Sequence, residues 1–278
     1  MRALIIYLVI SAVFIGCTPI LSIDASTQSV YHFSDTDKNI SLLDISETFG
    51  TYDGSFVLYD NNLDSWKIYD LEEATKRIPP ESTYKIYDAL LGLESGIITP
   101  EHSSMTWNGD AFPFPSWEAD QDLNSAMQNS VNWYFQAIDS QLGINRVQEF
   151  LNKIEYGNQT TSSNLDLYWS DFSLKISPLE QVTLLKKFNT NEFHLNFQNV
   201  FSVKNAIKIA STPNGNFYGK TGTGRVNGQD INGWFIGYVE TSDNSYYFAT
   251  NIQSDSNATG KKAFEITSDI LKKLHIWN

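Results

Sequence analysis

The sequence predicts a mixed α+β fold in which one antiparallel sheet is built from both ends of the chain, with a mainly helical lobe inserted between them. Apolar residues alternate in an early segment, recur with helical spacing through the middle, and alternate again in the last quarter. Strands at both ends of a compact chain usually join one sheet. We expect the sheet over about residues 41–75 and 214–278, flanked by helices, and the lobe over about residues 80–200. A cleft between the two parts would hold the functional site.

The early segment predicts a β-hairpin and then a helix. Residues 54–59 and 65–69 alternate like strands, and residues 61–64 (Asn-Asn-Leu-Asp) form the turn between them. Pro79-Pro80 then blocks a helix upstream. Over residues 86–93 apolar side chains recur at i, i+3, i+4 and i+7, which predicts a helix with one buried face.

The middle of the chain predicts further helices. Helical patterns cover residues 126–138, 147–154 and 179–188. Asn145 is the expected N-cap of the second of these helices and Ser177 of the third.

The end of the chain returns to strands and closes with a helix. Three segments alternate or are continuously apolar as strands are, at residues 217–222, 233–239 and 246–251. Residues 258–274 then form an amphipathic helical pattern. We therefore expect the C-terminal part to supply most of the sheet.

The composition is that of an acidic globular protein. With 278 residues, 41% of them hydrophobic and 14% aromatic, the chain can bury a substantial core. The net charge of −13 argues against nucleic acid as a partner, because an acidic surface repels phosphate backbones. No metal is expected, since the histidines lack ligand spacing. These are His32, His102, His194 and His275.

The first 40 residues predict an exported protein. Residues 3–16 are an uncharged, mostly apolar run, too short for a comfortable membrane span but suited to a signal-peptide core. Cys17, the only cysteine, follows Phe14-Ile15-Gly16 and resembles the lipidated cysteine of a bacterial lipobox, with phenylalanine where leucine is commoner. We therefore expect residues 1–16 to be a signal peptide and residues 17–40 the spacer of a membrane-anchored lipoprotein.

The alternative is a secretory signal that is cut later, near Ser26, so that Cys17 is discarded. Either processing route leaves the mature domain outside the cytoplasm. No disulfide is expected, because there is no second cysteine. No further apolar run of ~18 residues predicts another transmembrane helix.

Ser82 and Lys85 are the first candidates for covalent chemistry. Residues at i and i+3 share one helix face, so the Lys85 amine would lie beside a hydroxyl that is otherwise a poor nucleophile. A helix start after Pro79-Pro80-Glu81 would also present backbone N–H groups to a developing oxyanion. Burial of Lys85 would lower its pKa and allow it to act as a base. Taken alone, Ser82 is better explained as a helix cap, and Lys85 is as well explained as a lysine reaching water.

Two downstream motifs complete a candidate site. Ser130-Val131-Asn132, in a helical stretch, offers Ser130 as a proton relay to a leaving nitrogen. Residues 220–224 (Lys-Thr-Gly-Thr-Gly), on a predicted strand, offer a positive charge, hydroxyl groups and close backbone approach to a ligand. Alone, the first motif is a surface serine and the second an edge strand with a solvated lysine. Their order behind Ser82 and Lys85 favours a single site.

With these motifs the chain resembles a class D serine β-lactamase, and it is also similar to the extracellular penicillin-sensing domain of bacterial β-lactam sensor-transducers. The resemblance runs from about Asp53 to Lys273. The motifs that carry it are Pro80–Lys85 (Pro-x-Ser-Thr-Tyr-Lys), Ala89–Glu94, Tyr156-Gly157-Asn158, Trp169 with Leu174–Pro178, Lys220-Thr221-Gly222 and Gly233–Tyr238.

The resemblance implies an acyl-enzyme mechanism on β-lactam antibiotics. Ser82 would attack the lactam carbonyl. Lys85 would carry a CO₂-derived carbamate, as N6-carboxylysine, and act as the general base for acylation and deacylation. Trp169 would hydrogen-bond that carbamate through its indole N–H; the alternative for Trp169 is ordinary core packing. No cofactor other than this CO₂ is implied.

The remaining roles follow from the same resemblance. Ser130, helped by Lys220, would pass a proton to the departing nitrogen. The backbone N–H groups of Ser82 and Thr223 would form the oxyanion hole. Substrate binding would fall to Thr221, Gly222 and Thr223.

Three departures from the class D pattern bear on function. Asn132 stands where class D enzymes typically have an apolar residue that keeps the carbamate dry, and the sensor domains share this asparagine. An amide beside Lys85 would favour loss of CO₂ and leave the acyl-enzyme without a base for deacylation. Gly260-Lys261-Lys262 occupies the region where some enzymes carry a carboxylate-binding arginine, and residues 170–173 lack a glycine that is common there.

The sequence thus favours an exported class D β-lactamase that hydrolyses penicillins. The sensor-transducers have several membrane helices ahead of the sensor, whereas a single apolar segment is seen here. The alternative, favoured by Asn132, is a receptor that is acylated and deacylates slowly. A cell-wall D,D-transpeptidase or carboxypeptidase ranks third, because the segments around Tyr156 and Trp169 fit class D better.

Overall fold

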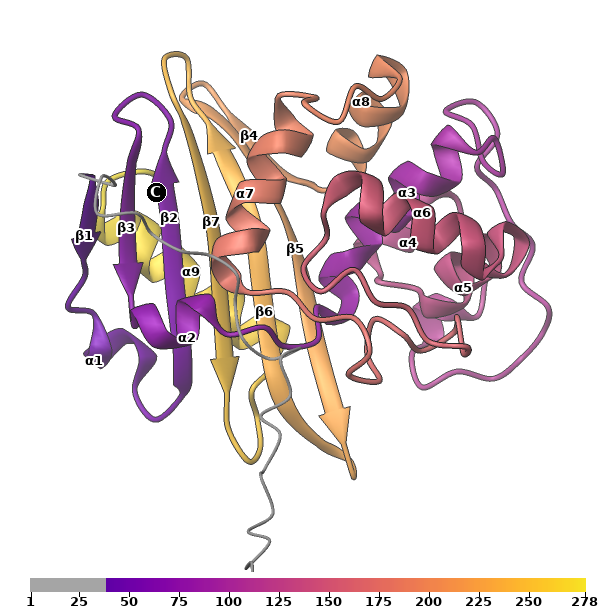
Figure 1. The fold of residues 1–278 in the computed structure, drawn as a ribbon, viewed down its shortest axis with the longest axis horizontal. Helices are drawn as coiled ribbons and strands as arrows, with labels where there is room; N and C mark the ends of the chain where they lie inside the picture. Colours follow the sequence, from indigo (N-terminus) through magenta and orange to yellow (C-terminus); the bar gives the residue numbers. More distant parts are fainter. Residues whose placement is uncertain (1–38) are drawn as a thin grey trace, which may run out of the picture.

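The computed structural model describes residues 39–278, which form a seven-stranded sheet with a helical lobe at one side (Figure 1). The strand order across the sheet is β1-β3-β2-β7-β6-β5-β4. β2 pairs with β7, so the two ends of the chain meet in one sheet and the predicted fold class is confirmed. The strands are β1 (Ile40–Leu42), β2 (Asp53–Asp60), β3 (Ser65–Tyr69), β4 (Lys208–Thr212), β5 (Gly215–Val226), β6 (Gln229–Glu240) and β7 (Ser245–Gln253).

The sheet differs from the prediction in two respects. Its second part begins at Lys208 instead of about residue 214, because β4 adds an edge strand on β5. β4 is mostly exposed and lacks the buried alternation that marks the other strands. Among the described pairs, β1 runs parallel to β3, whereas all the others are antiparallel.

Helices cover both faces of the sheet and fill the lobe (Figure 1). α9 lies behind the sheet and α7 crosses its front, while α3 to α6 lie beyond β5. The helices are α1 (Ser46–Phe49), α2 (Leu71–Thr75), α3 (Lys85–Glu94), α4 (Leu123–Gln128), α5 (Asn132–Leu142), α6 (Ile144–Ile154), α7 (Pro178–Asn189), α8 (Phe197–Ala206) and α9 (Gly260–Lys273).

The helix starts follow local chemistry, with one correction. Ser177 caps α7 in a capping box with Glu180, as its position predicts. Asn145 does not cap α6, which begins one residue earlier, after Gly143 at φ 75°. Glycine adopts this conformation without a Cβ penalty, so the chain turns there and not at the asparagine.

The predicted helix over residues 126–138 is two helices. α4 ends at Gln128 and α5 begins at Asn132. Ser130 lies in the turn between them with φ 56°, an uncommon conformation for serine. The break brings Ser130 out of the helix and into the site described below.

The core has two parts, one on each face of the sheet. Leucines and tyrosines are the commonest residues of the part that the sheet shares with the lobe, and phenylalanines are the commonest buried residues of the part between the sheet and α9. Within residues 39–278 no helix has the length and apolar character to span a bilayer. The predicted signal peptide, Cys17 and nearly all of the predicted spacer lie outside the described residues.

Candidate active site

Ser82 lies on the turn that joins the sheet to the helical lobe. It sits in a short 3₁₀ helix, η2 (Glu81–Tyr84), which runs directly into α3. Lys85 starts α3 and is fully buried, and its Nζ donates to Ser82 Oγ at 2.7 Å. The i, i+3 spacing therefore produces the predicted contact between amine and hydroxyl.

The Lys85 amine faces oxygen acceptors on one side and aromatic rings on the other. It donates to Asn132 Oδ1 at 2.5 Å, and to Ser130 O and Oγ at 3.1 and 3.3 Å. The ring centroids of Phe135 and Trp169 lie 5.7 and 6.0 Å from Nζ. This dry, oxygen-lined position keeps the amine pointed at Ser82 and at the turn between α4 and α5.

Burial lowers the pKa of Lys85 well below its ordinary value, and the neighbouring charge of Lys220 lowers it further. A neutral amine 2.7 Å from a hydroxyl can take up the proton of that hydroxyl. Ser82 is therefore placed beside a competent base.

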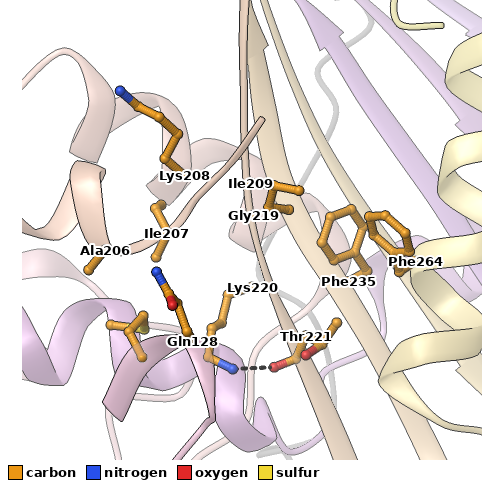
Figure 2. Close-up of a pocket in the computed structure, with 11 residues that line it drawn as sticks. Gln128, Ala206, Ile207, Lys208, Ile209, Gly219, Lys220, Thr221, Phe235 and Phe264 are labelled. Carbon is orange, nitrogen blue, oxygen red and sulfur yellow. Dashed lines mark hydrogen bonds between the residues drawn. The ribbon is translucent and has the colours of Figure 1, made fainter. Parts of the chain in front are cut away.

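Lys220 reaches the site from β5. Its Nζ donates to Ser130 Oγ at 2.9 Å. It also donates to Thr221 O at 3.0 Å, as Figure 2 shows. Burial lowers its pKa to about 7. Ser130 Oγ is thus within hydrogen-bond distance of both lysines, which is the geometry that the predicted proton relay requires.

A cavity lies beside Lys220 on the side shown in Figure 2. It measures about 440 Å³, and Gln128 from the end of α4 and Ile207 and Ile209 around the start of β4 line it. Gly219, Lys220 and Thr221 in the middle of β5 also line this cavity.

The middle of β5 passes close to the Ser82 turn because two glycines line it. A Cβ on Gly222 would lie 3.2 Å from the Ser82 nitrogen, tighter than side chains normally pack. Thr223 follows, and its Oγ1 accepts a hydrogen bond from the Gly260 N–H at the start of α9. The Thr223 side chain is thereby fixed towards α9, on the face of β5 opposite the Ser82 turn.

The acylation pocket is a cavity of about 460 Å³ in front of Ser82. Most of the predicted residues line it, namely Ser82, Ser130, Asn132, Thr221, Gly222 and Thr223. Sequence reasoning missed Phe114 and Trp117, whose tilted rings lie 5.2 Å apart between centroids, and Arg225, which pairs with Asp230. The loop that carries the two aromatic residues has no periodicity. Its alternation of aromatic residues and prolines is the one sequence feature that could have indicated a ligand-binding surface.

Trp169 is buried behind the catalytic turn. Its ring stacks on Tyr84 at 6.3 Å between centroids, and its carbonyl oxygen accepts the Glu81 N–H at 3.1 Å. Trp169 is therefore near Lys85, as the resemblance implies, and it also packs in the core. Its hydrogen bond to a carbamate stays a prediction.

A serine beside a buried lysine, a second serine in contact with two lysines and a strand that carries Lys-Thr-Gly are the arrangement of the penicillin-interacting serine proteins. The comparison with known sequences gives the family. Residues 51–272 match the penicillin binding protein transpeptidase domain, and the chain belongs to this family.

Individual relatives include both receptors and enzymes. The chain is 45% identical to the regulatory protein BlaR1 of Bacillus licheniformis over 99% of its own length and 45% of that protein. The solved C-terminal domain of the Bacillus licheniformis BlaR penicillin-receptor superposes with a TM-score of 0.85 at 45% identity, covering 89% of this chain and 100% of that one. A class D β-lactamase from Bacillus subtilis superposes with a TM-score of 0.80 at 36% identity, covering 85% and 97%. The chain thus spans about half the length of the full receptor.

Proposed function

We propose that this domain is a β-lactam receptor that is acylated at Ser82 and releases the acyl group slowly. The observation that carries the proposal is the 2.5 Å contact between Asn132 Oδ1 and Lys85 Nζ. It bears on the two half-reactions differently, because acylation needs a base next to Ser82 and deacylation needs a base that activates water.

Acylation is supported by the Ser82–Lys85 contact and by the lowered pKa of Lys85. Ser82 Oγ would attack the lactam carbonyl and transfer its proton to Lys85 Nζ. The C–N bond of the lactam would then break, and the nitrogen would take a proton through Ser130 Oγ, which receives hydrogen bonds from both lysines. The product of this half-reaction is an ester on Ser82.

Slow deacylation is supported by the acceptors around Lys85. Four oxygen atoms from Ser82, Ser130 and Asn132 lie within hydrogen-bond distance of its Nζ, more than the N–H groups of one amine can serve at once. A carbamate on Nζ would bring two more acceptor oxygens against these, so CO₂ would have to displace the Asn132 contact. Without the carbamate, the acyl ester lacks the base that the enzymes use for hydrolysis.

The relatives lend support to both outcomes, and we rank the receptor first. One of them is the solved C-terminal domain of the BlaR penicillin-receptor, at 45% identity. The second candidate is hydrolysis by a class D enzyme, favoured by the rings of Phe135 and Trp169, which form an apolar wall beside Lys85. In that candidate, CO₂ held on Lys85 would supply the general base. We further propose an extracytoplasmic location, which the apolar run of residues 3–16 supports.

The test is the lifetime of the acyl adduct. Purified protein is mixed with benzylpenicillin, and intact-mass spectrometry follows the adduct with and without bicarbonate. We expect one adduct per chain, absent in Ser82→Ala, that persists for many turnovers of an ordinary β-lactamase. Rapid hydrolysis that bicarbonate accelerates would contradict the receptor and support the enzyme.

Asn132→Val tests the observation itself. Removing the amide frees Lys85 for CO₂, so deacylation should accelerate at least about tenfold in bicarbonate while acylation changes little. Asn129→Val is the matched control, because Asn129 also lines the pocket but its side chain makes no contact with Lys85. Equal deacylation rates in the wild type and Asn132→Val would refute the role given to Asn132.

A further inference from the structure

Glu81 is a buried carboxyl group directly before the nucleophile, and the acylation scheme does not use it. Glu81 is only 5% exposed and lies in the turn that carries Ser82. Its backbone has φ 52°, in the left-handed region that residues with a Cβ rarely adopt. Such strain persists only where the surroundings fix the residue in place, and it clusters at functional sites.

The surroundings of Glu81 join the turn to the sheet. Its backbone N–H donates to Trp169 O at 3.1 Å, and Oε1 accepts the side-chain amide of Asn232 at 3.3 Å. Asn232, on β6, is itself fixed by a hydrogen bond to Pro79 O at 3.1 Å. Glu81 is therefore held at its carboxyl group from β6 and at its backbone N–H from the loop that carries Trp169.

Glu81 also packs along β5. A Cβ on Gly222 would lie 3.0 Å from the Glu81 Cβ, and a Cβ on Gly224 would lie 2.9 Å from its carboxyl carbon. The Glu81 side chain thus occupies the space that side chains at both glycines would fill. Thr223, whose backbone N–H is the predicted oxyanion donor, stands between those two glycines.

We infer that Glu81 is a positioning residue whose side chain fixes the spacing between Ser82 and the backbone N–H of Thr223. The inference rests on the proposed acylation of Ser82. Glu81 is not among the residues that line the pocket in front of Ser82, and in this inference it acts through the strand on which it packs. Because the Glu81 side chain packs against both Gly222 and Gly224, a change in its size or charge should shift the position of the Thr223 backbone N–H between them.

The charge of Glu81 adds a pH dependence. Burial raises the pKa of this carboxyl to about 8, against smaller opposing effects of the Asn232 hydrogen bond and the Lys85 charge. At neutral pH the group is a neutral acid. When it ionises, a negative charge appears beside the strand that must stabilise a developing oxyanion, so acylation slows.

Other titratable groups surround Glu81 and must be separated from it. Lys85 faces it from α3, and Lys220, on β5, titrates near pH 7. β6 contributes the neutral amide of Asn232, and the Arg225–Asp230 ion pair lies further along β5 and β6. Glu81→Gln keeps the shape of the side chain and removes its titration together with the effect of its charge on the pKa of Lys85. The difference between the wild type and this variant therefore reports what the charge of Glu81 does, and the titration of Lys220 is common to both.

The experiment is the rate of acylation by a fluorescent penicillin between pH 6 and 9.5, with thermal unfolding recorded in parallel. We expect the wild type to lose about tenfold in rate between pH 7 and 9 relative to Glu81→Gln, with a midpoint near the pKa of about 8. Glu81→Ala should be slower at every pH, because the spacer is gone, and Glu81→Gln should restore the rate at pH 7. Glu149→Gln on α6, which is exposed, should follow the wild type.

Two failures are distinguishable. If the wild type is labelled normally and Glu81→Gln has the same pH profile, or Glu81→Ala acylates at the wild-type rate while still folded, the inference on Glu81 is wrong and the proposed function stands. If no β-lactam labels the wild type at any pH, the proposed function fails and the inference falls with it.

Discussion

The helical lobe and the sheet each contribute one buried lysine to the same hydroxyl group, and the two lysines differ in what else they contact. Lys85, from α3, has its Nζ 3.3 Å from Ser130 Oγ and within hydrogen-bond distance of three further oxygens, including Ser82 Oγ. Lys220, from β5, donates to Ser130 Oγ at 2.9 Å and to Thr221 O. The pKa of each is lowered by burial, but only Lys85 lies within reach of the nucleophile.

The difference separates two duties that the motifs alone leave together. The lobe lysine is placed to take the proton from Ser82, and the sheet lysine to polarise Ser130 for the return of a proton to the leaving nitrogen. Asn132 hydrogen-bonds with Lys85, so the proposed control over deacylation lies on the lobe side of the site.

Replacing each lysine with methionine would test the difference between their roles most directly. Lys85→Met removes the base at Ser82 and should reduce the acylation rate about 1000-fold, within the range typical of general-base catalysis. Lys220→Met leaves the Ser82–Lys85 contact intact and should cost about 10- to 100-fold. Stopped-flow acylation measures both, with thermal unfolding as the control for folding. Equal losses would mean that the two lysines act as a single unit.

Much of this site could be predicted from the sequence, because its residues lie in short motifs with a fixed spacing. Ser82 and Lys85 share a helix face, and Lys220 and Gly222 lie on one strand, so local geometry places each pair. Ser130 was identified but placed inside a helix. Its turn depends on contacts with both lysines, which come from segments 45 and 90 residues away along the chain.

Glu81 shows where sequence reasoning stops. A glutamate before a serine carries no periodic or motif signal, and its importance depends on Gly222, Gly224 and Asn232 meeting it in the folded chain. The short edge strand β4 was missed for a related reason, since its residues are mostly exposed and only the pairing with β5 defines it. The fold class was predictable because the buried strands and helices carry their own periodicity.

Glu81 lies where the Ser82 turn packs on β5, and the pH dependence of the free energy of unfolding tests its protonation state there. Its pKa is raised from its ordinary value near 4.5 to about 8, so the neutral form is the one that folding favours. Between these values the unfolded chain releases the proton while the folded chain keeps it, and stability falls as pH rises, at about 1.4 kcal/mol per pH unit.

Glu81→Gln removes this dependence. The variant should therefore gain stability relative to the wild type by a few kcal/mol as pH is raised from 5 to 8, with no further gain above pH 8. Urea unfolding at several pH values measures the difference. A constant difference across this range would mean that Glu81 is ionised in the folded protein.

A buried carboxyl group, Asp88, shifts the pKa of Lys85, whereas burial alone accounts for the lowered pKa of Lys220. Asp88, one turn along α3 from Lys85, and Asp139, on α5, are both buried, and both Asp88 oxygens lack a hydrogen-bond partner. Burial raises the pKa of each, and the nearby Asp139 raises that of Asp88 further. Since two such carboxyls do not both ionise, the charge on Asp88 depends on Asp139.

This dependence predicts that Asp88→Asn and Asp139→Asn shift the acid limb of the acylation rate in opposite directions. Asp88→Asn removes a negative charge that raises the pKa of Lys85, so more of the amine is neutral and the acid limb of acylation moves to lower pH. Asp139→Asn lets Asp88 ionise more readily, which raises the pKa of Lys85 and moves that limb to higher pH. Each shift should be less than about one pH unit, because the effect of burial on Lys85 is larger. Shifts of the acid limb in the same direction in both variants would mean that Asp88 affects the pKa of Lys85 through packing and not through its charge.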